Sequence, residues 1–386
     1  MLIKILVLCS ALNAGDVSHS KAVLEAISNN NITVQKYEID ASKPADFVEK
    51  EYKVATEQIG GGKYITFAVG EKAMGALDDL AKSNALDTKH SYTALGIHQY
   101  FDTISKLQLN YIDIPEATLD TKAKLGVISK IPAKTLTFAV PANNPTPQIL
   151  KESYDNWDTK DKPSLGGKYI IVMLPGDAPD QSGKMQYYTT QSNKTLFDDV
   201  QKLWKKLGPD YKVIVQNGPR TGKHDSTTGK IACLHEYKNG EDSKIAVDKI
   251  SQQFIDDLRA AGIDHSFYNF AFELDGDKKR VVSYFNQLLY LAQNSNSYFV
   301  LPGESVSMLG QIPLYIESDR IIAFQPSSMN SAHKSIFDLA VGRSYISYFG
   351  DDGRIAPAKK RIKRQGDDAV DVAKDMLSGY NRFLQK

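Results

Sequence analysis

The stretch Ser297-Tyr298-Phe299-Val300-Leu301-Pro302-Gly303-Glu304-Ser305-Val306-Ser307-Met308 decides the fold of this 386-residue chain. Its first half is an apolar run typical of a buried strand, and Gly303 then permits a tight turn. Ser305 and Ser307 follow in the predicted first turn of a helix. A helix that begins directly after a strand presents free N–H groups and the positive end of its dipole. The stretch therefore predicts an α/β protein that binds a phosphate-bearing ligand, such as a nucleotide or nucleotide sugar.

The composition indicates a globular protein of two domains. Hydrophobic residues make up 42% and charged residues 24% of the chain, which is ordinary for such proteins. The length exceeds that of one ordinary core. A formal net charge of +1 argues against non-specific electrostatic binding of nucleic acid, so we expect no nucleic-acid partner.

The first residues allow two interpretations, a short signal peptide or a buried strand. We favour the strand, because a turn, a helix and a second strand follow and complete a β-α-β unit. No apolar run is long enough to span a membrane. We expect a cytoplasmic protein, with delivery to another cell or to mitochondria left open. Cys9 and Cys233 are both expected to be buried free thiols.

The N-terminal half alternates strands with helices, which predicts a doubly wound parallel sheet. The predicted strands are Ile3–Leu8, Ile32–Glu38, Tyr64–Val69, Tyr92–Gly96 and Leu136–Val140. The predicted helices are Ser18–Ser28, capped by Ser18 or Asp16, then Asp46–Gln58, Lys72–Ser83 and the partly helical Phe101–Lys106.

The run Pro141–Pro147 breaks this alternation, which restarts after a polar linker at 158–167. Strands are predicted at Lys168–Leu174, Tyr211–Gln216, Ser266–Phe270, the opening apolar run and Arg320–Phe324. Helices are predicted at Gln148–Trp157, Thr195–Leu207, Lys244–Ala261, Lys278–Ala292, Lys334–Ala340 and Asp368–Phe383. We therefore predict a Rossmann-like domain over 1–150, a second, nucleotide-binding one over 165–355, and a C-terminal helix over 365–386.

Ligands of open parallel sheets bind beyond the carboxyl ends of the strands. In the C-terminal domain three turns occupy that place, and they supply the substrate-binding candidates Gly176, Gly218, Arg220, Thr221, Gly303, Glu304, Ser305 and Ser307. Arg220 suits bidentate contact with phosphate, although a solvated surface arginine is the alternative. The loop lacks the Gly-Lys-Ser/Thr of a Walker motif. His224 and Asp225 just beyond it are weaker candidates.

In the N-terminal domain the corresponding turns supply Gly15, which opens the first helix, and the catalytic candidates Asp16, His19 and His98. Asp16 and His19 are candidates for general acid or base, and His98 would face the same cleft. The alternatives are that Asp16 only caps the helix and that the histidines are structural. No cluster has metal-ligand spacing, so we expect neither a metal nor another cofactor.

Two other segments are charged. Asp275-Gly276-Asp277 is interpreted as a solvated turn. Lys359–Arg364 holds five basic residues; a solvated connector is the simpler interpretation, and contact with an anionic membrane or a partner protein is the other.

These turns resemble the mitochondrial fission ELM-like family, whose members are similar to two-domain GT-B glycosyltransferases. Glu304-Ser305-Val306-Ser307-Met308 stands where that family has an acidic residue and Ser-Val-Ser-Met after a strand. Arg220-Thr221 matches an Arg-Thr pair, and the Gly15 turn matches more loosely. The resemblance implies two Rossmann-like domains facing a central cleft, nucleotide contacts mainly from the C-terminal domain, and a final helix that crosses back onto the N-terminal domain.

The chain departs from that pattern at two places. Family members commonly carry a Glu shortly after the motif, suited to ribose hydroxyls, where this chain has Leu309-Gly310-Gln311-Ile312. The family's Ser-Arg-Arg-Thr-Pro type loop is here Asn217–Gly222. Standard recognition of the donor is therefore altered, and the cleft is a candidate for a changed use.

Three hypotheses follow. The first is a GT-B-like enzyme acting at the anomeric carbon of a nucleotide-linked sugar, with the Gly303 turn holding the diphosphate and Arg220 neutralising its charge. The second is a glycosidic hydrolase that uses water to remove an ADP-ribosyl group from protein. The third is a non-catalytic module that binds a nucleotide sugar or a protein partner.

Overall fold

The computed structural model describes residues 2–11, 13–142, 144–157, 162–180, 182, 184–222, 247–275, 278–366 and 368–386, with the backbone alone at 14, 122 and 271–281. The chain forms two compact units. Unit 1 comprises Met1–Asn144 and Gly366–Lys386, and unit 2 comprises Pro145–Gln365. Each unit is an α/β structure with its own parallel sheet.

In the described part of unit 1, six strands form one sheet in the order β2-β1-β3-β4-β5-β6. The strands are β1 (Leu2–Cys9), β2 (Thr33–Asp40), β3 (Tyr64–Val69), β4 (Ser91–Gly96), β5 (Tyr111–Pro115) and β6 (Ala133–Thr137). All neighbouring pairs are parallel. The central strands β3 and β4 are buried along their whole length, because helices cover both faces of the sheet.

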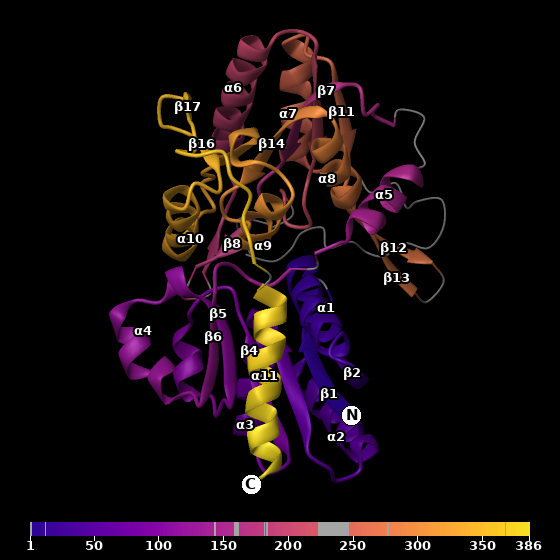
Figure 1. Cartoon of the computed structure of the whole chain (residues 1–386), viewed down its shortest axis with the longest axis vertical. Helices are drawn as coiled ribbons and strands as arrows, with labels where there is room; N and C mark the ends of the chain where they lie inside the picture. The colour runs from indigo at the N-terminus through magenta and orange to yellow at the C-terminus, as the bar shows by residue number, and fades with distance from the viewer. Residues whose placement is uncertain are drawn as a thin grey trace. The chain divides into compact units, whose positions relative to one another are not determined.

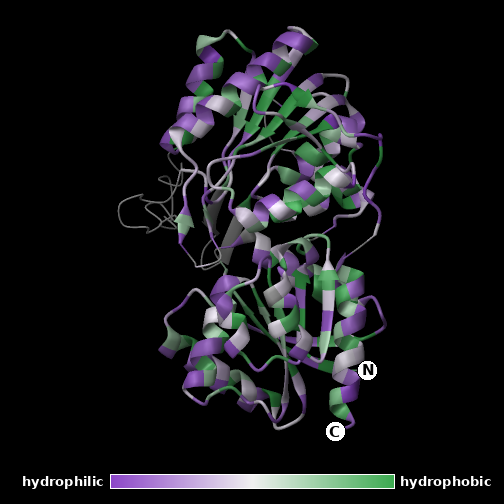
Figure 2. Ribbon diagram, turned by 90° about the vertical axis from the view of Figure 1, so that its left-hand side faces the viewer, coloured by the Kyte–Doolittle hydropathy of each residue, from purple (hydrophilic) through white to green (hydrophobic). Residues whose placement is uncertain are grey.

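The helices of unit 1 divide between the two faces (Figure 1). They are α1 (Ala14–Ser28), α2 (Ala45–Ile59), α3 (Glu71–Lys82), α4 (Thr121–Gly126) and α11 (Asp368–Leu384), with 3-10 turns η1 (Asp102–Lys106), η2 (Glu116–Thr118) and η3 (Ile128–Lys130). One core joins α2 and α3 to the sheet, and another joins α1 and α11 to its opposite face. Figure 2 shows the resulting apolar strands between helices of mixed polarity.

The last helix, α11, returns to unit 1 and packs beside α1 (Figure 1). Its Val372, Met376 and Tyr380 share a core with Ile27 of α1. The Tyr380 hydroxyl also donates to the carbonyl of Lys63 at 2.8 Å. This placement confirms the prediction of a C-terminal helix that crosses back onto the N-terminal sheet.

Among the described residues of unit 2, seven strands form a sheet in the order β11-β10-β7-β14-β15-β16-β17. They are β7 (Lys168–Met173), β10 (Tyr211–Gln216), β11 (His265–Tyr268), β14 (Asn296–Pro302), β15 (Ile321–Phe324), β16 (Ser347–Phe349) and β17 (Ile355–Ala356). Only the last pair, β16 with β17, is antiparallel. Two separate hairpins are β8 (Ala178–Pro179) with β9 (Met185–Gln186), and β12 (Ala271–Asp275) with β13 (Lys278–Val282).

Helices cover both faces of this sheet as well. They are α5 (Pro147–Asp155), α6 (Thr190–Leu207), α7 (Lys249–Ala260), α8 (Phe285–Asn294), α9 (Val306–Gln311) and α10 (Ser331–Gly342), with 3-10 turns η5 (Ile312–Leu314) and η6 (Ser318–Arg320). Leu196 of α6 and Phe254 of α7 pack on the face that carries Val172 and Val300. Phe285 of α8 meets Phe299, which points to the opposite face.

Each sheet has a topological switch point, where the chain stops adding strands toward one edge and begins to add them toward the other. In unit 1 the reversal separates β1 from β3, and in unit 2 it separates β7 from β14. At such a point two neighbouring carboxyl-end loops diverge, which is where open α/β sheets bind ligands. The topology therefore singles out the loops after β7 and β14, and those after β1 and β3.

Some predicted elements were wrong. The helix predicted at Lys278–Ala292 is strand β13 followed by the shorter helix α8. Strand β5 was missed, and the strand predicted at Leu136–Val140 begins earlier, as β6. Helix α1 is capped by Asn13, whose side chain accepts from two backbone N–H groups, and not by Ser18 or Asp16.

Candidate functional site

A backbone N–H and a buried carboxyl meet between the two central loops of unit 2. The N–H of Gly176, after β7, donates to Oε1 of Glu304, after β14, at 2.7 Å. Gly176 also leaves room for the neighbouring loop, because a Cβ there would lie 2.9 Å from the Cβ of Arg220. The bond therefore ties together the two loops that flank the reversal point of this sheet.

Glu304 keeps only 9% of its surface exposed. Its second oxygen, Oε2, is buried and has no hydrogen-bond partner among the described residues. Burial raises the pKa of the Glu304 carboxyl to about 7, while the Gly176 N–H and the Arg220 charge act in the opposite direction. The backbone N–H of Glu304 itself also lowers this pKa. An unsatisfied buried oxygen is costly, so a donor from outside the chain would stabilise this atom.

Gly303, Ser305 and Ser307 lie around Glu304 in a tight turn, and the two serine hydroxyls lie next to each other. The N–H of Gly303 donates to the Phe324 carbonyl at 2.8 Å, and a Cβ at Gly303 would lie 2.9 Å from that carbonyl oxygen. Ser305 is the N-cap residue of α9, yet its side chain makes no capping bond. Its Oγ instead lies 3.5 Å from Oγ of Ser307. The two half-buried hydroxyls are thus side by side next to Glu304.

The loop after β10 brings Arg220 to the same edge. The N–H of Gly218 donates to Oγ1 of Thr221 at 2.9 Å, and that hydroxyl reaches the Leu174 carbonyl at 3.5 Å. Thr221 is fully buried, so it holds the loop from within. Arg220 is half-buried and close enough to lower the pKa of Glu304. His224 and Asp225 lie outside the described residues.

Three further buried polar residues at this edge were not among the predicted site residues. Asp177 accepts the Tyr188 N–H at 2.7 Å, and the Tyr188 hydroxyl lies 3.0 Å from Asn193. Asn217 joins β10 to Asp248, at 3.0 Å, and to Asn269, at 2.8 Å. Asp177 and Asn217 directly follow β7 and β10, a position that could have marked them. Tyr188 carried no comparable signal.

At the corresponding edge of unit 1, Asp16 is buried against the loop after β3. Only 8% of Asp16 is exposed, and a Cβ on Gly70 would overlap its carboxylate. Gly70 also has φ +86°, a conformation that favours glycine. Burial and then the Asp16 charge raise the pKa of the Cys9 thiol to about 12. The N–H of Gly15 donates to Asn13 at 3.0 Å, within the cap of α1.

His19 forms an ion pair inside unit 1. Its Nε2 lies 2.9 Å from Oδ2 of Asp113, and the exposed fractions of the two side chains are 2% and 0%. The distance is that of an ion pair, but the angles do not meet the criteria of a hydrogen bond. Gly96 passes directly over the pair, since a Cβ there would lie 2.6 Å from the His19 ring. Asp113 lies in β5.

His98 is the most accessible of the three predicted catalytic residues. Its Nε2 lies 3.2 Å from Oε1 of Glu71 in α3, with 15% and 25% of the two side chains exposed. The ring also packs edge-on against Phe101. Unit 1 therefore gathers Asp16, His19 and His98 at one sheet edge, the two histidines each beside a carboxylate.

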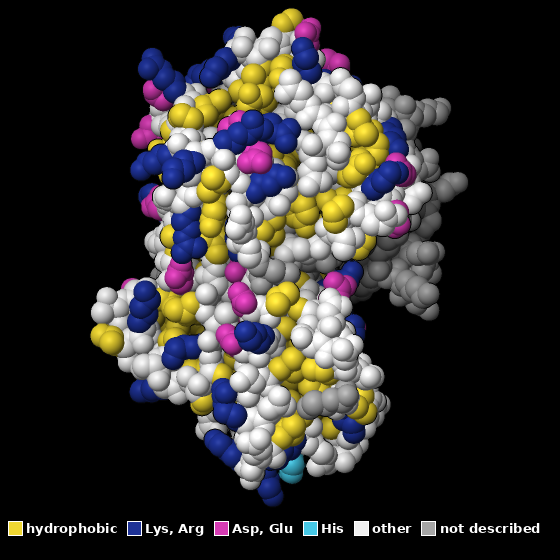
Figure 3. Space-filling model, viewed as in Figure 1, with side chains coloured by type: hydrophobic (Ala, Val, Ile, Leu, Met, Phe, Trp, Pro, Cys, Tyr) yellow, Lys and Arg dark blue, Asp and Glu magenta, His cyan; other side chains and the backbone are white. Residues whose placement is uncertain are grey.

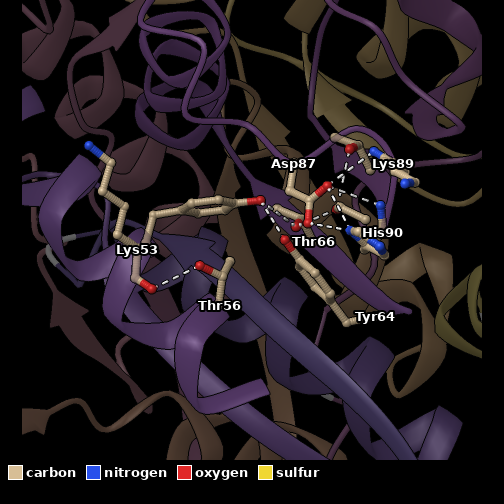
Figure 4. Close-up of polar contacts among 10 residues, drawn as sticks. Lys53, Thr56, Tyr64, Thr66, Asp87, Lys89 and His90 are labelled. Atoms are coloured by element: carbon tan, nitrogen blue, oxygen red, sulfur yellow. Dashed lines mark hydrogen bonds and ion pairs between the residues drawn. The ribbon is translucent and has the colours of Figure 1, made fainter. Parts of the chain in front are cut away.

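Polar groups at the opposite edge of this sheet pair with one another instead. Tyr64, the first residue of β3, meets Tyr52 at 3.0 Å, and the Ser91 hydroxyl donates to Thr66 at 2.6 Å. Nearby, His90 Nδ1 lies 2.9 Å from Asp87 (Figure 4). This edge is a structural network, and we place no site there.

The basic stretch Lys359–Arg364 is attached to unit 2. Arg364 is buried and donates to the Gly310 carbonyl at 3.0 Å, while Ser318 donates to the Lys360 carbonyl at 2.8 Å. Lys359, Lys360, Arg361 and Lys363 remain exposed. On the face in Figure 3 positive and negative side chains are intermixed. The stretch is thus a hydrogen-bonded connector with four exposed basic side chains.

Neither a metal cluster nor a membrane span was found. Among the described residues, no group of three or more His, Cys, Asp or Glu side chains is arranged to hold a metal ion. In that same part of the chain, no helix combines the length and the apolar character needed to cross a bilayer.

Comparison with known proteins gives matches to solved structures only. No family model and no curated protein matches the chain. The S. aureus MnaA-UDP co-structure is 8% identical with TM-score 0.48, covering 100% of this chain and 90% of that one. A putative UDP-N-acetylglucosamine 2-epimerase from Listeria monocytogenes is 9% identical with TM-score 0.45, covering 100% and 91%.

A third similar structure is Anabaena HepE in complex with UDP and glucose, 10% identical with TM-score 0.43 and covering 99% of this chain and 98% of that one. Scores below 0.5 at such identities establish no activity for this chain. The functional proposal therefore rests on the chain's own residues.

Proposed function

We propose that the carboxyl edge of the unit 2 sheet binds the diphosphate of a nucleotide-linked sugar, and that the protein acts at the anomeric carbon of that sugar. The observation that carries the proposal is Glu304, whose buried Oε2 lacks a partner at the point where the sheet reverses. Polar groups from three loops surround it. That arrangement suits a ligand with several oxygen atoms and negative charge.

Each binding residue has a distinct task in this proposal. Arg220 supplies the positive charge and a planar pair of donors for phosphate oxygens. Ser305 and Ser307 supply hydroxyl donors, because neither hydroxyl caps α9. Gly176 and Gly303 permit the close approach of the loops, and Gly218 and Thr221 fix the shape of the Arg220 loop.

The reaction we propose is glycosyl transfer. An acceptor hydroxyl oxygen forms a bond to the anomeric carbon, and the bond from that carbon to the diphosphate oxygen breaks. The diphosphate leaves with the bonding electrons, and Arg220 neutralises the charge that develops on it. A base accepts the proton of the acceptor hydroxyl.

The base is proposed to come from the carboxyl edge of unit 1, among Asp16, His19 and His98. His98 is the strongest candidate, because it is the most exposed and Glu71 contacts one of its ring nitrogens at 3.2 Å. A carboxylate in that position orients the imidazole. His19 and Asp16, both more than nine-tenths buried, are proposed to support the loops.

The resemblance of Glu304–Met308 and Arg220-Thr221 to the mitochondrial fission ELM-like family is retained as part of this proposal. The altered residues after the motif, Leu309–Ile312, support a hydrolytic alternative in which water is the acceptor and an ADP-ribosyl group is removed from protein. Helix α9 ends at Gln311, so no carboxylate on it can bind ribose hydroxyls.

The test is a panel of nucleotide sugars and ADP-ribose, with binding followed by thermal shift and products by mass spectrometry. Arg220→Ala is expected to weaken binding by about 10- to 100-fold, the loss of a charge-assisted contact. Arg354→Ala is the matched control, because Arg354 lies in the same unit with 89% of its side chain exposed.

Transfer of sugar to an added acceptor supports the main proposal, and release of ADP-ribose from modified protein supports the alternative. Binding without turnover would make the protein a binding module. Equal affinities of the two arginine variants, or no binding by the wild type, would contradict the proposed site.

A further inference from the structure

The two oxygens of the Glu304 carboxyl group have different surroundings. Oε1 accepts the N–H of Gly176 at 2.7 Å, as the carbonyl oxygen of a neutral acid does. Oε2 is buried and has no hydrogen-bond partner among the described residues. A neutral carboxyl would carry its proton on Oε2 and have one donor to offer a ligand.

Two charged side chains and one tyrosine hydroxyl surround Glu304. Asp177, after β7, adds a negative charge, and Arg220, after β10, adds a positive one. Tyr188, which precedes α6, is buried and its hydroxyl is bonded to Asn193. An ionised Glu304 would thus place two carboxylates beside one arginine at an edge that is to receive a diphosphate.

A neutral Glu304 removes that conflict. Burial is the first cause of its raised pKa, and the charge of Asp177 adds to it, against the opposing effects of Gly176 and Arg220. With a pKa of about 7, both forms are present near neutral pH. A ligand that binds one of the two protonation forms more tightly would shift the equilibrium toward that form.

We propose that Glu304 binds the ligand in its neutral form and donates a hydrogen bond from Oε2–H to a phosphate oxygen of the diphosphate. This deepens the proposed function and rests on it. The proton comes from solvent whenever the free protein is ionised, so binding is coupled to proton uptake. Affinity should then fall up to about tenfold for each pH unit above the pKa of the free carboxyl.

The experiment is calorimetric titration of the full chain with UDP-glucose and with ADP-ribose, from about pH 5.5 to about pH 8.5. Both probes carry diphosphate diesters whose charge is constant over this range. Repeating the titration in two buffers of different ionisation enthalpy measures proton uptake, which we expect to approach about one proton per ligand at the alkaline end.

Glu304→Gln tests the donor directly. The amide oxygen can accept the Gly176 N–H and the amide nitrogen can donate to phosphate, so the variant reproduces the neutral acid at every pH. We expect it to bind with the wild type's low-pH affinity throughout, without proton uptake. Its unfolding temperature is recorded to confirm that it is folded.

Asp177→Asn is the matched control, because Asp177 is also buried and accepts one N–H, from Tyr188, at 2.7 Å. It should keep the pH dependence, with a midpoint moved slightly lower. A wild-type affinity that does not change with pH overturns the inference. So does a folded Glu304→Gln variant that keeps the wild-type pH slope or fails to bind.

The experiment distinguishes failure of the proposed function from failure of the proposed role of Glu304. If neither probe binds the wild type at any pH, the diphosphate site is wrong and the role of Glu304 falls with it. If a probe binds with Arg220-dependent affinity but without proton uptake, the site stands and only the donor role of Glu304 is wrong.

Discussion

The carboxyl edges of the two sheets hold their acidic groups in opposite ways. In unit 1, Asp113 and Glu71 lie beside His19 and His98, each within ion-pair distance. In unit 2, Glu304 has one oxygen bonded to a backbone N–H and the other without a partner among the described residues. By the same hydrogen-bond criteria the Asp113 oxygens also lack a partner among the described residues. The difference is therefore that each acid of unit 1 has a histidine ring within ion-pair distance, while Glu304 is held by a backbone N–H.

The largest effect should come from breaking the buried pair of unit 1. Asp113→Ala removes a fully buried side chain beside His19, leaving a cavity and a buried ring nitrogen without its neighbour, which we expect to lower the free energy of unfolding by about 3–5 kcal/mol. Glu57→Ala, at an exposed helix position, should change it by less than about 0.5 kcal/mol. Denaturant unfolding measures both. A loss under about 1 kcal/mol for Asp113→Ala would show that the contact between Asp113 and His19 does not stabilise unit 1.

The second prediction concerns the pH dependence that Glu304 gives to stability. Its pKa rises from 4.5 to about 7 on folding, so its contribution is fully present below about pH 4.5 and is lost as pH rises through about 7. At about 1.4 kcal/mol per pH unit, the difference between 4.5 and about 7 amounts to at most about 3–4 kcal/mol.

Denaturant unfolding of the wild type and of Glu304→Gln, at about pH 4.5 and about pH 8, measures that contribution. The wild type should lose stability relative to the variant between the two values. An unchanged difference would mean that the pKa of Glu304 is not raised in the folded protein.

The third prediction tests the tight turn of unit 2. Gly303→Ala places a Cβ 2.9 Å from the Phe324 carbonyl oxygen and 3.0 Å from the Phe337 ring, which should cost about 1–3 kcal/mol and weaken ligand binding. Gly342→Ala is the control, since a Cβ there meets nothing within 4 Å. Thermal unfolding and the titration above measure both variants. Equal behaviour would show that the turn tolerates a side chain.

The smallest predicted effect concerns the basic connector. Arg364→Ala removes a buried donor from the Gly310 carbonyl and should cost about 1–2 kcal/mol. Lys360→Ala, at an exposed side chain, should stay within about 0.5 kcal/mol. Binding of the Lys360 variant to anionic vesicles, compared with wild type, tests the membrane hypothesis. A larger loss of stability for Lys360 than for Arg364 would contradict the connector.

The sequence predicted the elements with continuous apolar runs well. β3 and β10 have the predicted bounds, because such runs between turn residues are typical of parallel strands. β5 was missed because Asp113 and a final proline interrupt its pattern. Asp275-Gly276-Asp277 was interpreted as a solvated turn, but the Asp-Gly dipeptide was not taken as a hairpin signal, so a helix was predicted over Lys278–Ala292 where strand β13 begins.

The candidate site was predictable to the level of its loops and no further. Strand ends marked Gly176, Arg220 and Glu304, since carboxyl ends of parallel strands meet at one edge. The bond between Gly176 and Glu304 joins residues 128 positions apart, so no local pattern reports it. The pairing of His19 with Asp113 likewise depends on which strands become neighbours.

The most direct test of the central claim is a crystal structure of the full chain with UDP-glucose or ADP-ribose. The account predicts a diphosphate oxygen within hydrogen-bond distance of Oε2 of Glu304, with the Arg220 guanidinium on a neighbouring oxygen. A diphosphate seated beside Asp16 at the edge of unit 1, or any pose that leaves Oε2 of Glu304 without a partner, would contradict it.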